Sequence, residues 1–115
     1  MNFNEYQDLA TRTAKFSDFS DNGVDVKGLA YCGLGLNGEA GEVAELVKKL
    51  IRDDKGDLSE ERRQKIKAEL GDVLWYLSQT ARLSGFTLDE IAQHNIDKLW
   101  SRHERGKIHG SGDDR

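Results

Sequence analysis

The sequence predicts a single all-α domain, and three observations lead to that prediction. The 115 residues include no proline, the residue that most strongly interrupts a helix interior. Apolar residues recur three and four positions apart over long segments, which is the spacing of one helix face. No segment alternates apolar and polar residues with the period of two that is typical of a strand. We therefore expect residues 1–115 to form one domain resembling a four-helix bundle.

The first helix is expected over residues 3–16. Its apolar face would consist of Phe3, Tyr6, Leu9, Ala10 and Phe16. Residues 17–27, SDFSDNGVDVK, are rich in Ser, Asp, Asn and Gly, which favour turns through local side-chain hydrogen bonds or through positive φ angles. This segment is therefore predicted to be a loop.

A second, long helix is expected over residues 29–52, where apolar residues again follow the helical period. Its first half contains Gly33, Gly35, Gly38 and Gly41. Each of these glycines costs about 0.5 to 1 kcal/mol relative to alanine inside a helix. Two explanations stay open, either tight packing of the helix or a substrate lying over the bare backbone.

The third and fourth helices are predicted from their end signals. Asp57 and Glu60 have the spacing of a capping box, so the third helix is expected to begin there and to end at Gly85. Thr87 and Glu90 form a second capping box. Phe86 and Ile91 occupy the two positions of a hydrophobic staple around the start of the fourth helix. That helix is expected to end at Gly106, before a mobile tail over residues 107–115.

Composition narrows the classes of partner and compartment. A net charge of −4 provides no global positive field for nucleic-acid phosphates, so no nucleic-acid partner is expected. Cys32 is the single cysteine, and residues 1–10 lack a signal-peptide pattern, which favours a cytoplasmic protein. No apolar run reaches the roughly 20 residues needed to cross a bilayer, so no membrane partner is expected. A domain this small gains buried surface by pairing with itself, which favours a homo-oligomer, either a dimer or a dimer of dimers.

One motif is set aside. Residues 33–38, GLGLNG, match the dinucleotide-binding pattern G-x-G-x-x-G, with Asp53 about twenty residues further on. That motif requires a strand before it and a helix after it within a βαβ unit, and no strand is predicted here. We therefore expect no dinucleotide cofactor.

Two pairs of acids carry the functional prediction. Glu39 and Glu42 are three residues apart on the second helix, and Glu69 and Asp72 are three apart on the third, so each pair shares a helix face. Four carboxylates meeting beside a core would repel one another unless cations or raised pKa values relieved the charge. Oxygen ligands without Cys or His favour Mg²⁺, with Mn²⁺ as a substitute. From the spacing alone, two solvated acidic faces remain the alternative.

The context of these acids resembles a known family. The segments GLNGEAGEVAELVKK and KAELGDVLWYL are similar to the MazG-like nucleoside triphosphate pyrophosphohydrolases, all-α relatives of the dimeric dUTPases. Their signature is E-x-x-E, a spacer and E-x-x-D, and the resemblance extends over nearly the whole chain. It implies that Glu39, Glu42, Glu69 and Asp72 hold Mg²⁺ and that a nucleoside triphosphate is cleaved to monophosphate and pyrophosphate. It also implies that Glu39 or Glu42 acts as the general base.

Further residues are expected around this site. Asn95, Lys98 and Arg102 share one face of the fourth helix, and the run N-x-x-K-L-x-x-R matches the family, which implies substrate contacts. A solvated face is the alternative. Lys65, one turn before Glu69, is a further candidate for a phosphate contact. Trp75 is a candidate for stacking on the base, although packing in the core or in a dimer interface is the more favoured interpretation.

Other polar residues are predicted to have minor roles. Glu45 is interpreted as a surface residue rather than as a further acid of the site. His94, His103 and His109 show no metal-ligand spacing with Cys32 and are interpreted as surface residues. The tail GKIHGSGDDR is interpreted either as a lid that orders over bound phosphates or as a disordered terminus.

The sequence therefore predicts a Mg²⁺-dependent nucleoside triphosphate pyrophosphohydrolase that removes non-standard or excess nucleotides, a house-cleaning function. The base and sugar preferences are left open. The alternative function is a non-catalytic helical module for dimerisation or interaction. A di-iron carboxylate bundle is disfavoured, because that class uses Glu-x-x-His pairs that neither acid pair provides.

Overall fold

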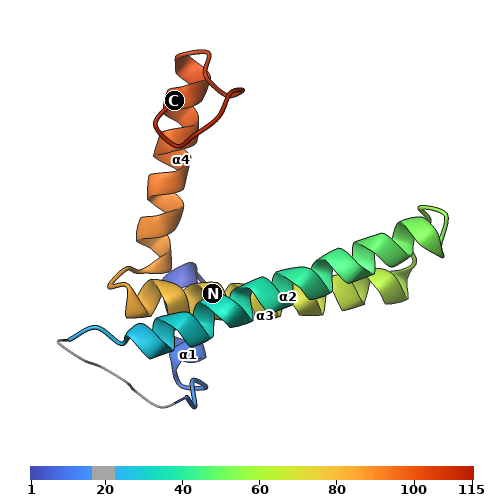
Figure 1. Ribbon diagram of the computed structural model, residues 1–115, viewed down its shortest axis with the longest axis horizontal. Coiled ribbons are helices and arrows are strands. Elements are labelled where there is room, and N and C mark those ends of the chain that lie inside the picture. Colours follow the sequence, from blue (N-terminus) through green and yellow to red (C-terminus); the bar gives the residue numbers. More distant parts are fainter. Residues whose placement is uncertain (17–22) are drawn as a thin grey trace.

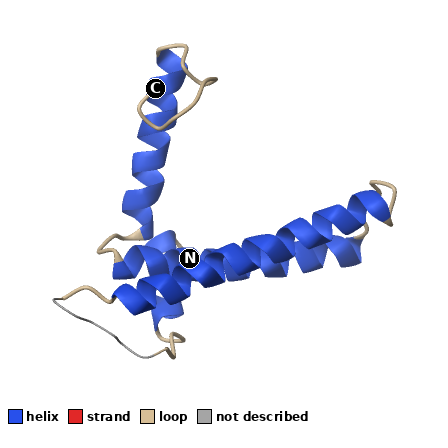
Figure 2. Ribbon diagram, in the orientation of Figure 1, coloured by secondary structure: helices blue, strands red, loops and turns tan. Residues whose placement is uncertain are grey.

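The computed structural model describes residues 1–16 and 23–115, which form four α-helices and no β-sheet (Figures 1 and 2). The helices are α1 (Phe3–Thr11), α2 (Val26–Arg52), α3 (Glu60–Leu83) and α4 (Leu88–Glu104). The predicted all-α class is confirmed. Most of the predicted loop at 17–27 lies outside the described residues, and its last two residues belong to α2.

Helix α1 is shorter than predicted. It begins after Asn2, whose side chain accepts a hydrogen bond from the Glu5 amide, and it ends at Thr11 instead of residue 16. The Thr13 hydroxyl donates to the Ala10 carbonyl at 2.7 Å, so a local turn replaces the next helical hydrogen bond. Phe16, predicted to lie on the helix face, instead packs its ring 5.1 Å from the ring of Tyr31.

Helices α2 and α3 form a long antiparallel hairpin and lie side by side over most of their length (Figure 1). The predicted start of α3 is wrong by two residues. Asp57 instead closes the turn after α2, with its amide donating to the Asp54 carbonyl. The helix is capped by Ser59, whose hydroxyl accepts from the Arg62 amide. Arg62 also pairs with Asp54 at 2.9 Å, which braces the tip of the hairpin.

Helix α4 has the predicted capping box, in which Thr87 and Glu90 each accept a hydrogen bond from the other's amide. Its predicted end is also confirmed, because Gly106 adopts a φ of +68° directly after the last turn. The helix contacts α1 and α3, but it rises away from the α2–α3 hairpin instead of lying along it (Figure 1). A single chain therefore does not close the four-helix bundle that the sequence predicted.

The junction of α1, α3 and α4 is held by a buried glutamine. The Gln7 amide nitrogen donates to the carbonyls of Ser78 and Phe86, both at 3.1 Å, and its oxygen accepts from the Leu88 amide at 3.1 Å. Gln7 is 7% exposed, so these hydrogen bonds are shielded from water. One side chain thus ties the start of α4 to α1 and α3.

Packing within the chain explains one of the four glycines that the sequence singled out in α2. A Cβ atom on Gly35 would collide with the ring of Tyr76, so Gly35 permits tight packing of α2 against α3. A Cβ atom on Gly33, Gly38 or Gly41 would meet no atom of the described residues within 4 Å. At these three positions packing within the chain gives no reason for glycine.

Much of the apolar surface remains uncovered. Leu34 and Ile51 on α2 are 77% and 72% exposed, and Trp100 on α4 is 59% exposed. Few apolar side chains are fully buried among the described residues, and they comprise Ala10, Cys32, Ala81 and Leu88. The faces that the sequence assigned to a core are therefore only partly buried in one chain. Among the described residues, no helix combines the length and apolarity needed to cross a membrane.

Candidate metal centre

Three carboxylates converge between α2 and α3. Glu39 lies near the middle of α2, and Glu69 and Asp72 lie on the adjacent stretch of α3. Each offers one carboxylate oxygen, and the three oxygens lie within 4.8 Å of one another. We refer to Glu39, Glu69 and Asp72 as the acidic cluster. The antiparallel hairpin thus brings together three of the four acids that the sequence selected.

The electrostatics of the acidic cluster favour a cation. Burial raises the pKa of Glu39, and the nearby charges of Asp72 and Glu69 raise it further. Among the described residues, no lysine or arginine forms an ion pair with any of the three carboxylates. All three donors are hard oxygen ligands, which suit Mg²⁺ or Mn²⁺. The donor set therefore fits a divalent metal ion.

Glu42 occupies a different position. It is exposed and does not belong to the group of converging oxygens, so the expectation that all four acids meet is not met within one chain. Its charge nevertheless contributes to the raised pKa of Glu39, which places it close to the acidic cluster. Glu42 is thus a neighbour of the cluster with a carboxylate that faces solvent.

A cavity of about 350 Å³ adjoins the acidic cluster and is lined by Glu39, Asp72, Trp75 and Tyr76. Its volume falls at the lower end of the range for small-ligand pockets, about 300 to 1,000 Å³. The Trp75 indole nitrogen donates to the Thr13 hydroxyl at 2.8 Å, and the Trp75 and Tyr76 rings meet edge to face with centroids 5.0 Å apart. Both rings therefore stand in fixed positions beside the carboxylates.

Tyr6 lies in this region, although the sequence did not single it out as part of the metal site. Burial raises the pKa of Tyr6, and the nearby charge of Asp72 raises it further, which places this α1 residue near the cluster. Burial, followed by a hydrogen bond with Tyr31, raises the pKa of Tyr76. The periodicity of α1 did indicate that Tyr6 faces inward, but it gave no sign of the acids opposite.

The structure separates the α4 candidates from the acidic cluster. Asn95, Lys98 and Arg102, which we call the α4 stripe, lie on the helix that rises away from the hairpin. Lys65 pairs with Glu61 at 3.1 Å on the exposed side of α3.

The residues that the sequence assigned to the surface are exposed in the structure. Glu45 pairs with Lys48 at 2.9 Å, and both side chains are about half exposed. His94, His103 and His109 are exposed, and none joins a group of candidate metal ligands in the described part of the chain.

Comparison with known proteins defines the class of the molecule. The MazG nucleotide pyrophosphohydrolase domain matches residues 30–106, which contain both acid pairs, α3 and α4. The chain is also 44% identical to the Gene 37 protein of Mycobacterium phage L5 over the full length of both chains. No solved structure matches the chain. The protein therefore belongs to the MazG nucleotide pyrophosphohydrolase family.

Proposed function

We propose that this protein is a Mg²⁺-dependent hydrolase that cleaves nucleoside or deoxynucleoside triphosphates between the α and β phosphates, yielding a monophosphate and pyrophosphate. The observation that carries the proposal is the acidic cluster in a domain of the MazG family, where the converging carboxylates have no basic partner among the described residues. Removal of non-standard or excess nucleotides from a cytoplasmic pool is the role that such an activity would serve.

The proposed metal ligands are Glu39, Glu69 and Asp72, with Glu42 as a further candidate. A bound divalent cation would neutralise charge on the phosphoryl oxygens during displacement. Because one carboxylate oxygen of Glu39 lies within the converging group, Glu39 would serve as a ligand of the cation. The exposed carboxylate of Glu42 is free to accept a proton from the attacking water, which favours Glu42 over Glu39 as the general base.

The adjoining cavity is the proposed site for the nucleoside. Trp75 and Tyr76 present aromatic surface beside the carboxylates, and stacking of a base on such a surface contributes about 1 to 3 kcal/mol. The hydrogen bond to Thr13 holds the Trp75 ring in place before a ligand arrives. This arrangement supports the candidate role of Trp75 in base stacking.

We further propose that the protein acts as a homo-oligomer. Its accessible surface is 8325 Å², whereas a compact monomer of this mass would expose about 6,300 Å². Its radius of gyration is 17.2 Å, compared with about 13 Å for a compact domain of this length. The excess surface of about 2,000 Å² per chain is of the size that obligate dimers bury. Exposed Leu34 and Ile51 provide apolar contacts for such an interface.

A second copy would also complete the site. The α4 stripe contains the cationic side chains that the family resemblance assigns to the triphosphate, yet α4 rises away from the hairpin that carries the acids (Figure 1). Gln7 contributes three hydrogen bonds to the junction from which α4 rises. In this proposal, Lys98 of one copy therefore contacts the triphosphate that is bound at the acidic cluster of another copy.

The test is a pyrophosphate-release assay with Mg²⁺ over a panel of standard and modified NTPs and dNTPs. Pyrophosphate and monophosphate in equal amounts are the expected products. Release of inorganic phosphate would contradict the proposed bond cleavage. Inactivity across the panel would favour the alternative function, a non-catalytic dimerisation module.

A further inference from the structure

The C-terminal tail, residues 107–115, folds back onto α4. The Arg115 guanidinium donates to the carbonyls of Lys107, Ile108 and Gly112, and Arg105 donates to the Arg115 carbonyl oxygen at 2.8 Å. Gly110 and Gly112 adopt φ angles of +121° and +80°, which side-chain-bearing residues rarely adopt, so the turn depends on glycine. Specific contacts thus hold the tail against the helix.

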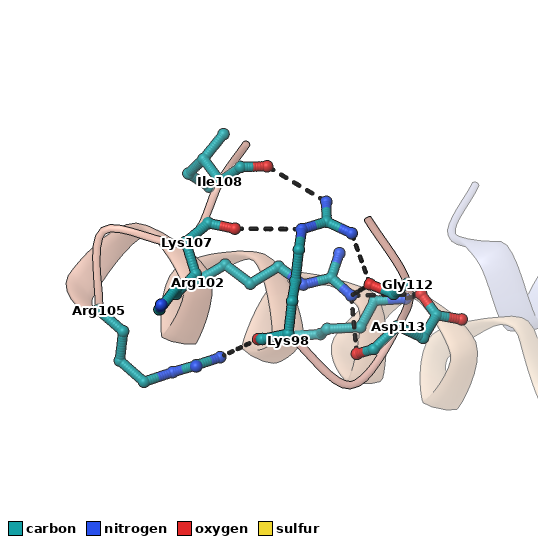
Figure 3. Close-up of polar contacts among 8 residues, drawn as sticks. Lys98, Arg102, Arg105, Lys107, Ile108, Gly112 and Asp113 are labelled. Atoms are coloured by element: carbon teal, nitrogen blue, oxygen red, sulfur yellow. Dashed lines mark hydrogen bonds and ion pairs between the residues drawn. The ribbon is translucent and has the colours of Figure 1, made fainter. Parts of the chain in front are cut away.

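This fold places a tail carboxylate on the cations of the α4 stripe (Figure 3). One Asp113 oxygen lies 3.2 Å from the Lys98 ammonium nitrogen and 3.2 Å from an Arg102 guanidinium nitrogen. The same guanidinium nitrogen donates to the Asp113 carbonyl at 2.9 Å. Because Lys98 and Arg102 stabilise its charge, the pKa of Asp113 lies below its usual value, and the carboxylate is ionised at neutral pH.

Arg102 has donor capacity that the tail does not use. The residue is 5% exposed, and its buried Nε atom has no hydrogen-bond partner within residues 1–16 and 23–115. Buried arginine donors are normally satisfied, because an unpaired buried donor is unfavourable. A phosphate group offers more acceptor oxygens than a carboxylate and commonly binds arginine through two parallel hydrogen bonds. The Lys98–Arg102 pair is therefore better suited to a phosphate group than to Asp113.

We propose that the tail is an autoinhibitory latch, in which Asp113 occupies the cation pair Lys98 and Arg102 until a phosphate group of a polyphosphate ligand displaces it. This inference rests on the proposed function insofar as Lys98 and Arg102 serve the triphosphate. Displacement exchanges one anion for another at the same two cations, and the tail is then released from α4. The latch lowers the apparent affinity for polyphosphate by the fraction of molecules in which Asp113 is bound.

The expected change in Kd depends on the strength of the Asp113 ion pair, in which the carboxylate is largely exposed. Pairs of this kind shift an equilibrium only severalfold, because solvent screens them. Removing the Asp113 charge is therefore expected to lower the Kd for a polyphosphate by about two- to sixfold. A matched control is available in Asp114, which carries the same charge on the adjacent residue but makes no contact recorded among the described residues.

The experiment measures binding of inorganic tripolyphosphate by calorimetry, without turnover, to the full-length protein and to its variants D113N and D114N. The latch predicts a lower Kd for D113N than for D114N. It also predicts that tripolyphosphate makes the bond after Lys107 more sensitive to a lysine-specific protease in the wild type. Equal Kd values for the two variants, or no binding by any of them, would overturn the latch.

The outcome is separable from the proposed function. If the wild type releases no pyrophosphate while D113N still binds tripolyphosphate more tightly than D114N, the latch holds and the hydrolase proposal fails. If pyrophosphate is released but D113N and D114N bind equally, the hydrolase proposal stands and the latch is wrong.

Discussion

The acidic cluster and the α4 stripe carry opposite charges. They also differ in whether other side chains of the protein pair with those charges. Glu39, Glu69 and Asp72 converge without a basic partner among the described residues. The cations Lys98 and Arg102 are covered by the chain's own Asp113. The acids and the cations lie on parts of the molecule that stand apart in a single chain (Figure 1). Under the proposed function, each region supplies half of a polyphosphate site, the acidic cluster holding the metal and the α4 stripe, which Asp113 covers in this structure, binding the phosphates.

The largest effect is expected from a substitution in the acidic cluster. Glu39→Gln removes the charge of one converging carboxylate, so we expect pyrophosphate release to fall by about 10² to 10³-fold, as when a preorganised charge contact in an active site is lost. The control is Glu45→Gln, the same substitution on the same helix at a residue paired with Lys48. Magnesium is expected to raise the melting temperature of the wild type and of E45Q but not that of E39Q. Equal activities of the two variants would contradict the assignment.

The second-largest effect is expected from a substitution of Gln7 at the junction of α1, α3 and α4. Gln7→Ala removes three buried hydrogen bonds and leaves the Leu88 amide unpaired, so we expect the free energy of unfolding to fall by about 2 to 4 kcal/mol. Asn4→Ala is the control, because Asn4 accepts a comparable hydrogen bond from the Asp89 amide at an exposed position. Urea unfolding measures both variants. Similar losses would show that Gln7 does not hold α4 in place.

The smallest of these three effects is expected from a substitution in the α4 stripe. Lys98→Ala removes one charged hydrogen bond to phosphate, so we expect kcat/KM to fall by about ten- to a hundredfold. Lys67→Ala serves as the control, because Lys67 is exposed on α3 and has no contact recorded among the described residues. Steady-state kinetics with the preferred triphosphate measures both variants. A loss confined to K67A, or shared equally by the two, would contradict the role of the stripe.

The sequence was a good guide to local features and a weaker guide to packing. The capping box of Thr87 and Glu90 depends on neighbouring residues only, and it was predicted correctly. Spacing on two helices allowed Glu39 to meet Glu69 and Asp72, and the family resemblance favoured that arrangement over two solvated acidic faces. By contrast, Ser59 was missed as the start of α3 because Asp57 has equally good capping chemistry and is used in the preceding turn.

Two features depend on contacts between distant segments, which no local pattern records. Gln7 was not singled out by the sequence, and it is buried because its amide bonds backbone groups of α3, of the α3–α4 connection and of the start of α4. Asp113 was assigned to a mobile tail, and the structure shows it bound to Lys98 and Arg102. The mobility of the tail in solution stays a prediction.

A subunit-mixing experiment tests most directly whether one copy supplies the acids of a site and another copy supplies its Lys98. Chains carrying Glu69→Gln and chains carrying Lys98→Ala are co-expressed with different tags, and the hybrid is assayed for pyrophosphate release. A shared site predicts recovery, because a hybrid dimer pairs the intact acids of the K98A chain with the intact Lys98 of the E69Q chain. Random association would restore about a quarter of the wild-type activity. Activity no greater than that of the separate variants, with hybrids present, would contradict the account.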